Sequence, residues 1–192
     1  MIATLIRGSY DFFLRIIGYR FLLITGDPLV LDRWLWLTQR FGPAREKIRT
    51  LDVGCGNGAF SIALAKKGYE ILGIDYFTDV TRIERRRDIL HATNATFEQW
   101  DIRKLSKRND LAGAFDSTIC LEVIEHVLQD EQLMCDIGKC LKPGGKLYLT
   151  TPNIGYIPIS KGDNGPFSQI EDGSHVRRGY AQKDLERICL TA

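Results

Sequence analysis

The sequence predicts an α/β fold built on a mostly parallel sheet. From Arg49 onward, short apolar runs alternate with helical stretches, which is the β-α-β-α order of parallel sheets covered by helices on both faces. The chain has 192 residues, 44% of them hydrophobic, which is enough to fill one core without disulfides or a structural metal. We therefore expect one globular unit.

The expected strands and helices follow one another along the second part of the chain. The strands are expected at 49–53, 69–74, 95–100, 115–121 and 146–150, and the helices at 59–67, 80–91, 133–141 and 182–190. Right-handed crossovers bring the carboxyl ends of parallel strands to one edge of the sheet, where such sheets bind ligands. Candidate ligand-binding residues should therefore directly follow the strands.

The first 43 residues have a different pattern and are predicted to form an N-terminal helical cap, leaving 44–192 as the main domain. Apolar residues recur at helical spacing from Ile2 to Phe21, with Arg7, Asp11 and Arg15 facing elsewhere, and a second helix is expected at 29–41. No run reaches the roughly 18 apolar residues of a membrane-spanning helix. The alternative interpretation is a basic amphipathic helix that lies on an anionic membrane.

Composition narrows the classes of function and compartment. Lysine and arginine exceed aspartate and glutamate by only two, so nothing predicts the strong positive field of a nucleic-acid-binding protein. The five cysteines form no CxxC pair and fall largely in apolar stretches, which favours buried thiols and a reducing cytoplasm. Peripheral contact with the membrane remains open, and the oligomeric state is not predicted.

A glycine-rich turn at residues 51–60, LDVGCGNGAF, joins an expected strand directly to an expected helix. Glycines in such a turn permit positive φ and let a ligand approach the backbone closely. Gly54, Gly56 and Ala59 also satisfy the GxGxxA form of the dinucleotide fingerprint. The negative charge of Asp52 is unfavourable beside a pyrophosphate but favourable beside an ammonium and a sulfonium, which S-adenosylmethionine carries.

Two further acids end the next two expected strands. Asp75 follows the glycine turn by about 20 residues, the separation expected for an acid that accepts hydrogen bonds from a ribose diol. Asp101 ends the third strand, where a carboxylate can accept a hydrogen bond from the adenine amine. For each acid the alternative is a helix N-cap or a turn residue.

The motifs LDVGCGNG, GIDYF, WDIRKL, FDSTICLEVIEHV, LKPGGKLYLTTPN and HVRRGYAQKDL together resemble those of class I S-adenosylmethionine-dependent methyltransferases. Within that class the chain is similar to the ubiquinone-biosynthesis O-methyltransferases and the related type 11 and type 12 small-molecule enzymes. The resemblance runs from about Arg49 to the C-terminus. It implies a Rossmann-like sheet, S-adenosylmethionine as cofactor, and methyl transfer to a small-molecule acceptor such as the hydroxyl of a quinone or sugar.

The resemblance also assigns cofactor contacts. It implies that the glycines line the methionine part, that Asp52 lies near the amino group, that Asp75 holds the ribose, and that Asp101 and Ile102 contact the adenine. The implied cofactor-binding residues are Asp52, Gly54, Cys55, Gly56, Gly58, Asp75, Tyr76, Asp101, Ile102 and Leu121.

The residues after the fourth strand carry the candidate catalytic groups. If a helix begins at Glu122, then Glu122, Glu125 and His126 share one face, with His175 reaching in from a late loop. Such a cluster looks like the metal site of certain RNA 2'-O-methyltransferases. The alternative is two acids in a first helical turn and a packed histidine. We assign no metal and take Glu122 and His175 as candidate catalytic residues, with His175 a potential base for an acceptor hydroxyl.

Three other segments receive structural or substrate-related interpretations. Residues 151–179 are rich in turn-forming residues and are a candidate substrate loop or lid. The string Leu141 to Lys146, LKPGGK, should end a helix and turn the chain into the fifth strand. Four arginines between 82 and 87 are expected to form a solvated helix face.

The resembling family continues with two more strands, so the chain is expected to lack the last two strands of the sheet and to be truncated relative to the family. Two other functions compete with methyl transfer. An NAD(P)-dependent oxidoreductase is supported by the GxGxxA match and Asp75, and disfavoured by Asp52 and Asp101. A noncatalytic S-adenosylmethionine-binding protein is the second alternative.

Overall fold

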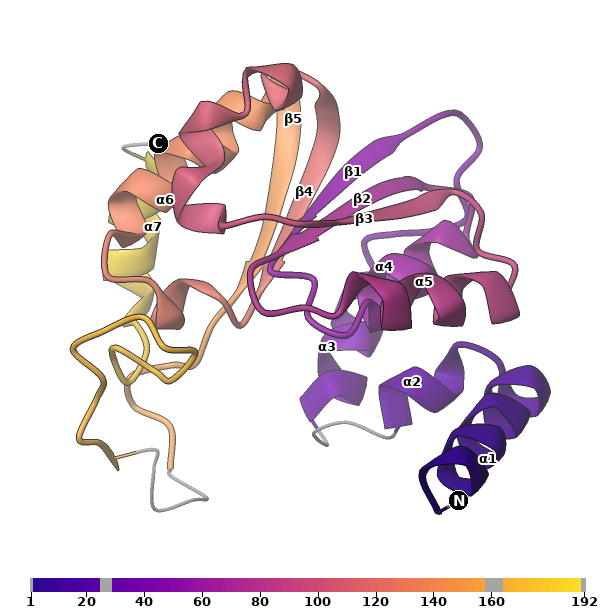
Figure 1. Cartoon of the computed structure of the whole chain (residues 1–192). Helices are drawn as coiled ribbons and strands as arrows, with labels where there is room; N and C mark the ends of the chain where they lie inside the picture. Colours follow the sequence, from indigo (N-terminus) through magenta and orange to yellow (C-terminus); the bar gives the residue numbers. More distant parts are fainter. Residues whose placement is uncertain (1, 25–28, 158–163, 191–192) are drawn as a thin grey trace. The chain divides into compact units, whose positions relative to one another are not determined.

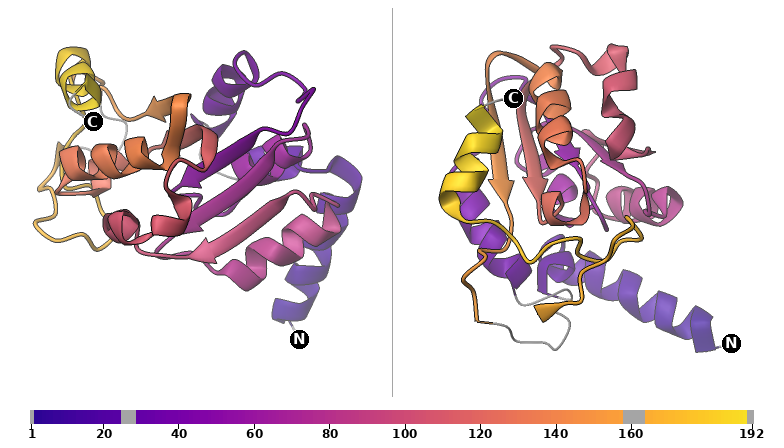
Figure 2. Two further views of the ribbon diagram at one scale, coloured as in Figure 1. Left: turned by 90° about the horizontal axis from the view of Figure 1, so that it is seen from above. Right: turned by 90° about the vertical axis from the view of Figure 1, so that its left-hand side faces the viewer.

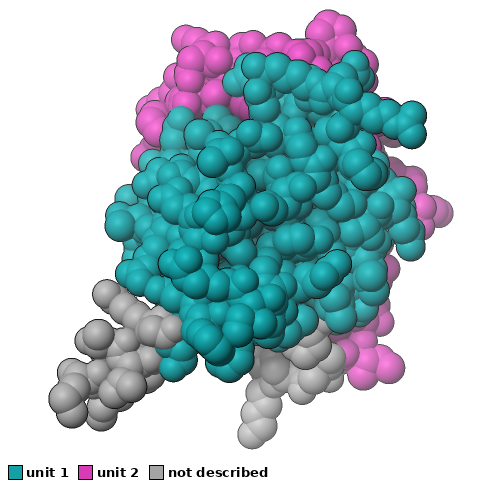
Figure 3. Space-filling view, turned by 90° about the vertical axis from the view of Figure 1, so that its right-hand side faces the viewer, with its two compact units in different colours: residues 1–99 teal, residues 100–192 magenta. Residues whose placement is uncertain are grey.

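The structure is a computed structural model that describes residues 2–24, 29–157 and 164–190. The chain divides into two compact units, Met1–Gln99 and Trp100–Ala192 (Figure 3). Each unit contains parallel strands and helices of its own.

The first unit is built around three parallel strands, β1 (Arg49–Val53), β2 (Glu70–Asp75) and β3 (Ala95–Gln99). They lie side by side in the order β3-β2-β1 (Figure 2). Leu51, Val53 and Ile74 are fully buried, as expected for strands that are covered on both faces. The parallel register brings the carboxyl ends of β1 and β2 together, with Val53 opposite Ile74.

Two helices cover this sheet and continue from its strands. Helix α4 (Ala59–Ala65) follows β1, and α5 (Val80–Ile89) follows β2; both pack against the strands (Figure 1). Helix α5 begins at a side-chain cap, because Asp79 accepts a hydrogen bond from the Arg82 backbone N–H at 3.1 Å. Since each helix starts just after a strand ends, its first turn lies at the ligand-binding edge.

Three N-terminal helices precede the sheet: α1 (Ile2–Ile17), α2 (Arg20–Ile24) and α3 (Leu29–Thr38). The expected first helix is shorter than predicted, because Gly18 has a φ of 74° and breaks the pattern that extends to Phe21. Helix α1 packs on α5, and α2 packs on α4. These helices fall inside the predicted cap, whose role as a separate domain stays a prediction.

The second unit contains two parallel strands, β4 (Phe115–Leu121) and β5 (Leu141–Thr150), with α6 (Asp130–Cys140) and α7 (Gln182–Leu190) next to each other beside them (Figure 2). Opposite Asp116 the register shifts from Leu141 to Lys146. The turn predicted for LKPGGK therefore occurs as an irregularity inside β5, with Gly144 at a φ of 78°.

Three short 3-10 helices complete the second unit: η1 (Ile102–Lys107), η2 (Asn109–Leu111) and η3 (Ile124–His126). Buried Asp136 of α6 links this helix to η1, since its carboxylate accepts a hydrogen bond from the Ser106 backbone N–H. Lys139, also on α6, donates to the same carboxylate. Among the described helices, none has both the length and the apolar character that crossing a bilayer requires.

Candidate functional site

The glycine turn of the first unit is fixed to the end of β2. The backbone N–H groups of Gly54 and Cys55 both donate to the carbonyl of Ile74, at 2.8 and 3.1 Å. Gly54, Gly56 and Gly58 all have positive φ, between 52° and 75°, a backbone conformation that residues other than glycine rarely adopt. The turn thus takes the conformation that the sequence predicts for a backbone approached by a ligand.

Gly58 also has no room for a side chain. A Cβ atom added there would lie 2.4 Å from Cγ2 of Ile83 and 3.3 Å from the ring of Phe97. By contrast, an added Cβ at Gly56 would meet nothing within 4 Å. Gly58 is therefore required for packing α5 against the turn, whereas Gly56 keeps the backbone accessible.

Asp52 is buried beside the turn. Oγ of Ser61 on α4 donates a hydrogen bond of 2.5 Å to its carboxylate. Burial raises the pKa of Asp52 to about 7, the Ser61 hydrogen bond opposes this, and the negative charge of Asp75 adds to it. The carboxyl group consequently changes charge near neutral pH and would be stabilised as an anion by an incoming cation.

Asp75, the last residue of β2, is hydrogen-bonded to the same turn. Its carboxylate accepts hydrogen bonds from the backbone N–H groups of Gly56, at 2.9 Å, and Phe77, at 2.8 Å. The Thr78 hydroxyl donates to the Gly56 carbonyl at 2.6 Å. The structure thus brings Asp52 and Asp75 to one turn, with the exposed rings of Tyr76 and Phe77 following.

Cys55, between the glycines, is buried. Burial raises the pKa of its thiol far above the usual value, and the negative charges of Asp52 and Asp75 raise it further. The thiol therefore stays protonated at neutral pH and has no nucleophilic role.

Arg86 corrects the prediction of a solvated arginine face on α5. It is buried, donates a hydrogen bond of 2.8 Å to the carbonyl of Asn57, and lies over the ring of Tyr10. Arg85 pairs with Asp11. The reason is that α1 covers α5, which places two of these arginines in contact with other elements.

In the second unit, Asp101 is the N-cap of η1. Its carboxylate accepts hydrogen bonds from Nε and Nη2 of Arg103 at 2.6 and 2.9 Å, and from the Arg103 backbone N–H at 3.2 Å. These bonds hold the pKa of Asp101 at about 2. The capping alternative therefore describes Asp101, with Ile102 starting the helix, and the adenine contact stays a prediction.

Leu121, which is buried, ends β4, and Glu122 directly follows the strand. The helix considered to begin at Glu122 does not form. Glu122 has a φ of 56°, and only the short η3 follows. Oε1 of Glu122 accepts a hydrogen bond of 2.9 Å from the Thr150 hydroxyl of β5. Glu122 therefore lies apart from the group that the helical spacing was expected to bring together.

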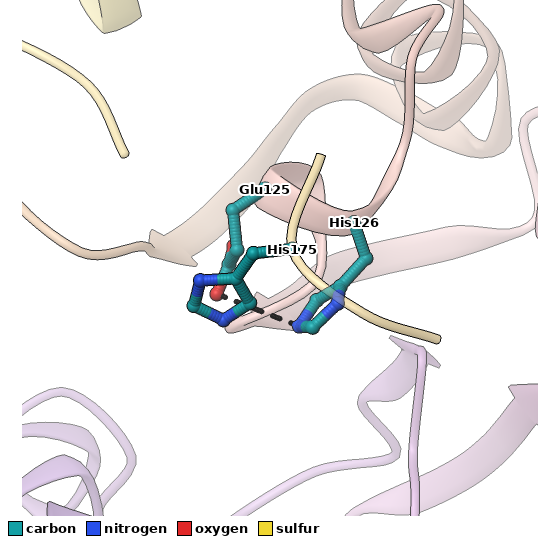
Figure 4. Close-up of side chains that lie close together, drawn as sticks. All are labelled: Glu125, His126 and His175. Atoms are coloured by element: carbon teal, nitrogen blue, oxygen red, sulfur yellow. Dashed lines mark ion pairs between the residues drawn. The ribbon is translucent and has the colours of Figure 1, made fainter. Parts of the chain in front are cut away.

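Glu125, His126 and His175 do converge (Figure 4). One potential ligand atom from each lies within 4.8 Å of the others. Nε2 of His126 is 4.0 Å from Oε1 of Glu125, and the two imidazole rings meet edge to face with centroids 4.6 Å apart. Glu125 is fully buried, and the two histidines are half-buried.

The cluster fits a divalent cation. Two imidazoles and one carboxylate are ligands that zinc, iron and manganese ions accept. Nδ1 of His126 is buried without a hydrogen-bond partner among the described residues. Nε2 of His126 and Oε1 of Glu125 lie 4.0 Å apart and would have to move closer to ligate one ion, because metal–ligand bonds of about 2.0–2.2 Å bring neighbouring ligand atoms nearer than that.

The late loop that carries His175 is tied to the start of this cluster. The Val176 N–H donates to the carbonyl of Glu125 at 2.9 Å. Arg177 and the Tyr180 hydroxyl both hydrogen-bond to the carboxylate of Asp130 on α6. His175 therefore has a fixed backbone position, although its loop is rich in glycine.

Sequence reasoning missed several supporting residues. Ser61, Thr78 and Arg86 hold Asp52 and the glycine turn, yet none stands in a motif that assigns it a partner. Only the position of Thr78 directly after GIDYF hinted at the turn. These supporting contacts depend on burial and on the packing of residues that are far apart in the sequence.

Comparisons with known proteins agree with this fold. A ubiquinone biosynthesis O-methyltransferase of Xanthomonas axonopodis pv. citri is 30% identical over 127 residues, which are 66% of this chain and 50% of that protein. The protein of the same name from Coxiella burnetii is 33% identical over 135 residues, 69% of this chain and 55% of that protein. The chain thus spans about half the length of these curated relatives.

Solved structures share the fold over nearly the whole chain. Phosphoethanolamine N-methyltransferase 2 of Haemonchus contortus, crystallised with phosphomonomethylethanolamine and S-adenosylhomocysteine, aligns with a TM-score of 0.66 at 23% identity. The alignment covers 94% of this chain and 43% of that one. This confirms the predicted α/β, Rossmann-like class.

The methyltransferase domain family matches residues 30–190. That range includes the glycine turn, all five strands and the late loop. The resemblance drawn from the sequence motifs is thereby confirmed, and the chain belongs to the methyltransferase domain family.

Proposed function

We propose that the protein binds S-adenosylmethionine and transfers its methyl group to a hydroxyl oxygen of a small-molecule acceptor. One observation carries the proposal: the carboxyl groups of Asp52 and Asp75 meet at a glycine turn whose backbone a ligand can approach. A cationic nucleoside suits this pair, whereas the pyrophosphate of a dinucleotide would be repelled.

Asp75 and Asp52 are proposed to contact different parts of the cofactor. Asp75 exchanges its hydrogen bonds with the turn for those of a ribose diol, and Asp52 becomes ionised opposite the ammonium group. The bound cofactor supplies an electrophilic methyl group on a sulfonium. Because the transfer is an in-line displacement, the main task of the chain is to orient both reactants and exclude water.

Glu122 and His175 are proposed to act on the acceptor side. A neutral imidazole at His175 can take the proton of an acceptor hydroxyl, and the carboxylate of Glu122 can accept a hydrogen bond from another group of the acceptor. Oxygen as the acceptor atom is supported by the names of the two curated relatives, both ubiquinone biosynthesis O-methyltransferases.

A divalent cation held by Glu125, His126 and His175 is an alternative to His175 acting as the base, because an imidazole that ligates an ion cannot also take the proton. The close approach of three ligand groups supports it. A bound cation would lower the pKa of an acceptor hydroxyl and so make it a better nucleophile.

Calorimetry with S-adenosylmethionine, S-adenosylhomocysteine and NADH tests the cofactor. We expect binding of the first two and none of NADH, with Asp75→Ala weakening binding at least about tenfold through loss of hydrogen bonds to a charged group. Asp79→Asn is the matched control, because asparagine caps a helix as well as aspartate does. Binding of NADH alone would instead support the oxidoreductase.

Transfer of labelled methyl groups to a panel of phenols, sugars and amines tests the reaction. A labelled phenol or sugar product supports the proposal. Tight binding of S-adenosylmethionine without any product would support a noncatalytic binding protein, and a labelled amine would contradict oxygen as the acceptor atom.

Titration with zinc, manganese and magnesium ions tests the cation. His126→Ala should abolish binding of the ion, whereas His91→Ala, which changes an exposed histidine elsewhere, should leave it unaltered. Equal binding by both variants would remove the cation from the proposal without affecting cofactor binding.

A further inference from the structure

Helix α1 presents large apolar side chains to solvent. Phe12, Phe13, Ile16 and Ile17 are 57%, 45%, 66% and 38% exposed. Positions 12, 13, 16 and 17 fall within one arc of a helix with 3.6 residues per turn. They form a continuous outward surface, which we call the apolar face of α1.

The opposite side of α1 holds the helix in place. Leu14 is fully buried, Asp11 pairs with Arg85 of α5, and the ring of Tyr10 lies beneath Arg86. A solvent-exposed helix normally turns its apolar side inward and its charges outward. Here an ion pair faces the protein and four apolar side chains face away, so the exposure follows from how the helix is anchored.

Charge distinguishes this segment from the rest of the chain. The first 43 residues contain five arginines and three aspartates, whereas residues 44–192 contain 21 basic and 21 acidic residues. The whole excess of two positive charges therefore lies in the N-terminal segment. Arg15 and Arg20, both exposed, lie on α1 and at the start of α2, next to the apolar face.

The size of the apolar face argues against a stable dimer. At about 200 Å² for each large side chain, the four exposed fractions sum to roughly 400 Å². A specific protein–protein interface buries about 800 Å² on each partner. An interfacial helix needs less, because aromatic and aliphatic side chains enter the bilayer boundary while neighbouring arginines attract anionic lipid.

We propose that the apolar face of α1 binds the surface of a bilayer that contains anionic lipid, with Arg15 and Arg20 contacting the headgroups. The helix then lies in the plane of the interface, where an apolar acceptor dissolved in the membrane would be close to the protein. The proposal does not depend on methyl transfer, because its test requires neither cofactor nor acceptor.

Co-sedimentation with phosphatidylcholine vesicles, with and without phosphatidylglycerol, tests the proposal. The protein should bind the anionic vesicles and be released by salt. Phe12→Ser combined with Ile16→Ser should lower the affinity at least about tenfold, through loss of apolar burial without a change of charge. Phe13 is left intact because it stacks on Phe21.

The matched control is Ile170→Ser combined with Leu190→Ser, which removes two apolar side chains that are 67% and 86% exposed in the other unit. It should bind vesicles as the unchanged protein does. Arg15→Gln combined with Arg20→Gln should weaken binding to anionic vesicles only. Circular dichroism verifies that all variants are folded.

Three results would overturn the inference. One is equal vesicle binding by the Phe12/Ile16 variant and the unchanged protein. Another is equal binding to vesicles with and without phosphatidylglycerol. The third is a dimer in solution that the Phe12/Ile16 substitutions dissociate, since it would identify a second copy as the occupant of the face.

Discussion

At the scale of single residues, Asp52 links burial to ligand binding. Its pKa of about 7 means that the proton is retained in the folded protein between about pH 4 and 7, where an unfolded chain has lost it. Ionising Asp52 thus lowers the stability of the free protein as pH rises through this range. A cationic ligand reverses the preference, because it favours the ionised carboxyl.

We therefore predict that the affinity for S-adenosylmethionine rises with pH up to about 7 and then levels off, by about tenfold per pH unit below the pKa. Calorimetry across this range measures the effect. In Asp52→Asn the dependence should disappear, and the free variant should be more stable than the unchanged protein above neutral pH. A slope that persists in Asp52→Asn would assign the titration to another group.

Gly58 gives a second prediction at this scale. Gly58→Ala combines a positive φ with a Cβ only 2.4 Å from Ile83, and should lower the free energy of unfolding by about 2–4 kcal/mol in denaturant titrations. Gly113→Ala is the control: its φ is 59° and its added Cβ meets nothing within 4 Å, so only the backbone strain of about 1–2 kcal/mol remains. Equal losses would exclude the clash with Ile83.

The sequence identified the glycines and the first two acids because a turn and its charges lie together along the chain. It could not identify Ser61 or Arg86, whose partners are set by packing. The proposed cofactor roles rest on two properties that Asp52 and Asp75 share: both carboxyl groups lie at the glycine turn, and both are acidic.

At the scale of elements, η1 depends on Asp101. The carboxylate both caps the helix and pairs with Arg103, and its pKa of about 2 means that this stabilisation is present above about pH 4 and lost as pH falls toward 2.

Asp101→Asn keeps a capping side chain but loses the ion pair, so it should reduce stability by about 1 kcal/mol at neutral pH. Urea titrations at neutral and acidic pH measure this difference, which should shrink as the solution becomes acidic. Asp110→Asn, an exposed pair with Arg108, is the control and should change stability little. A difference that is constant with pH would exclude the carboxylate charge as its cause.

The accuracy of the predicted bounds differs between elements: β5 begins at Leu141 rather than at residue 146, whereas the helix predicted at 182–190 agrees with α7 to the residue. The predicted 49–53 and 115–121 agree with β1 and β4 to the residue, because buried parallel strands are short apolar runs. The helix expected at Glu122 failed because a residue in the left-handed region breaks helical spacing, and the sequence does not encode φ directly. The cluster of Glu125, His126 and His175 was anticipated from their chemistry, although it forms without that helix.

At the scale of the whole molecule, the five cysteines form no disulfide and differ in exposure. Cys55, Cys120 and Cys140 are buried, Cys135 is half-buried and Cys189 is exposed. A thiol reagent should therefore modify Cys189 first, Cys135 more slowly, and all five only in denaturant. Mass spectrometry of the labelled peptides measures the order. Early modification of Cys120 would show that β4 opens readily, and Cys189→Ser should lose the fast phase alone.

The α/β class was predictable for the whole molecule because alternation of strands and helices is a property of the entire sequence. The two compact units were not, since the alternation of strands and helices continues across residues 99 and 100, where the units divide. Nor does hydrophobic content reveal that the apolar face of α1 points outward, because that depends on which side of the helix α5 holds.

The left-handed backbone at Glu122 offsets the stability that the side chain of this residue contributes to the folded molecule. Glycine there would relieve a strain of about 1 kcal/mol and forfeit a hydrogen bond with Thr150 of about the same value. Glu122→Gly should then melt at nearly the unchanged temperature while methyl transfer falls. Thr150→Val, which loses only the bond, should melt lower. Because the side chain of Glu122 adds little net thermal stability, it is available for a role in the reaction.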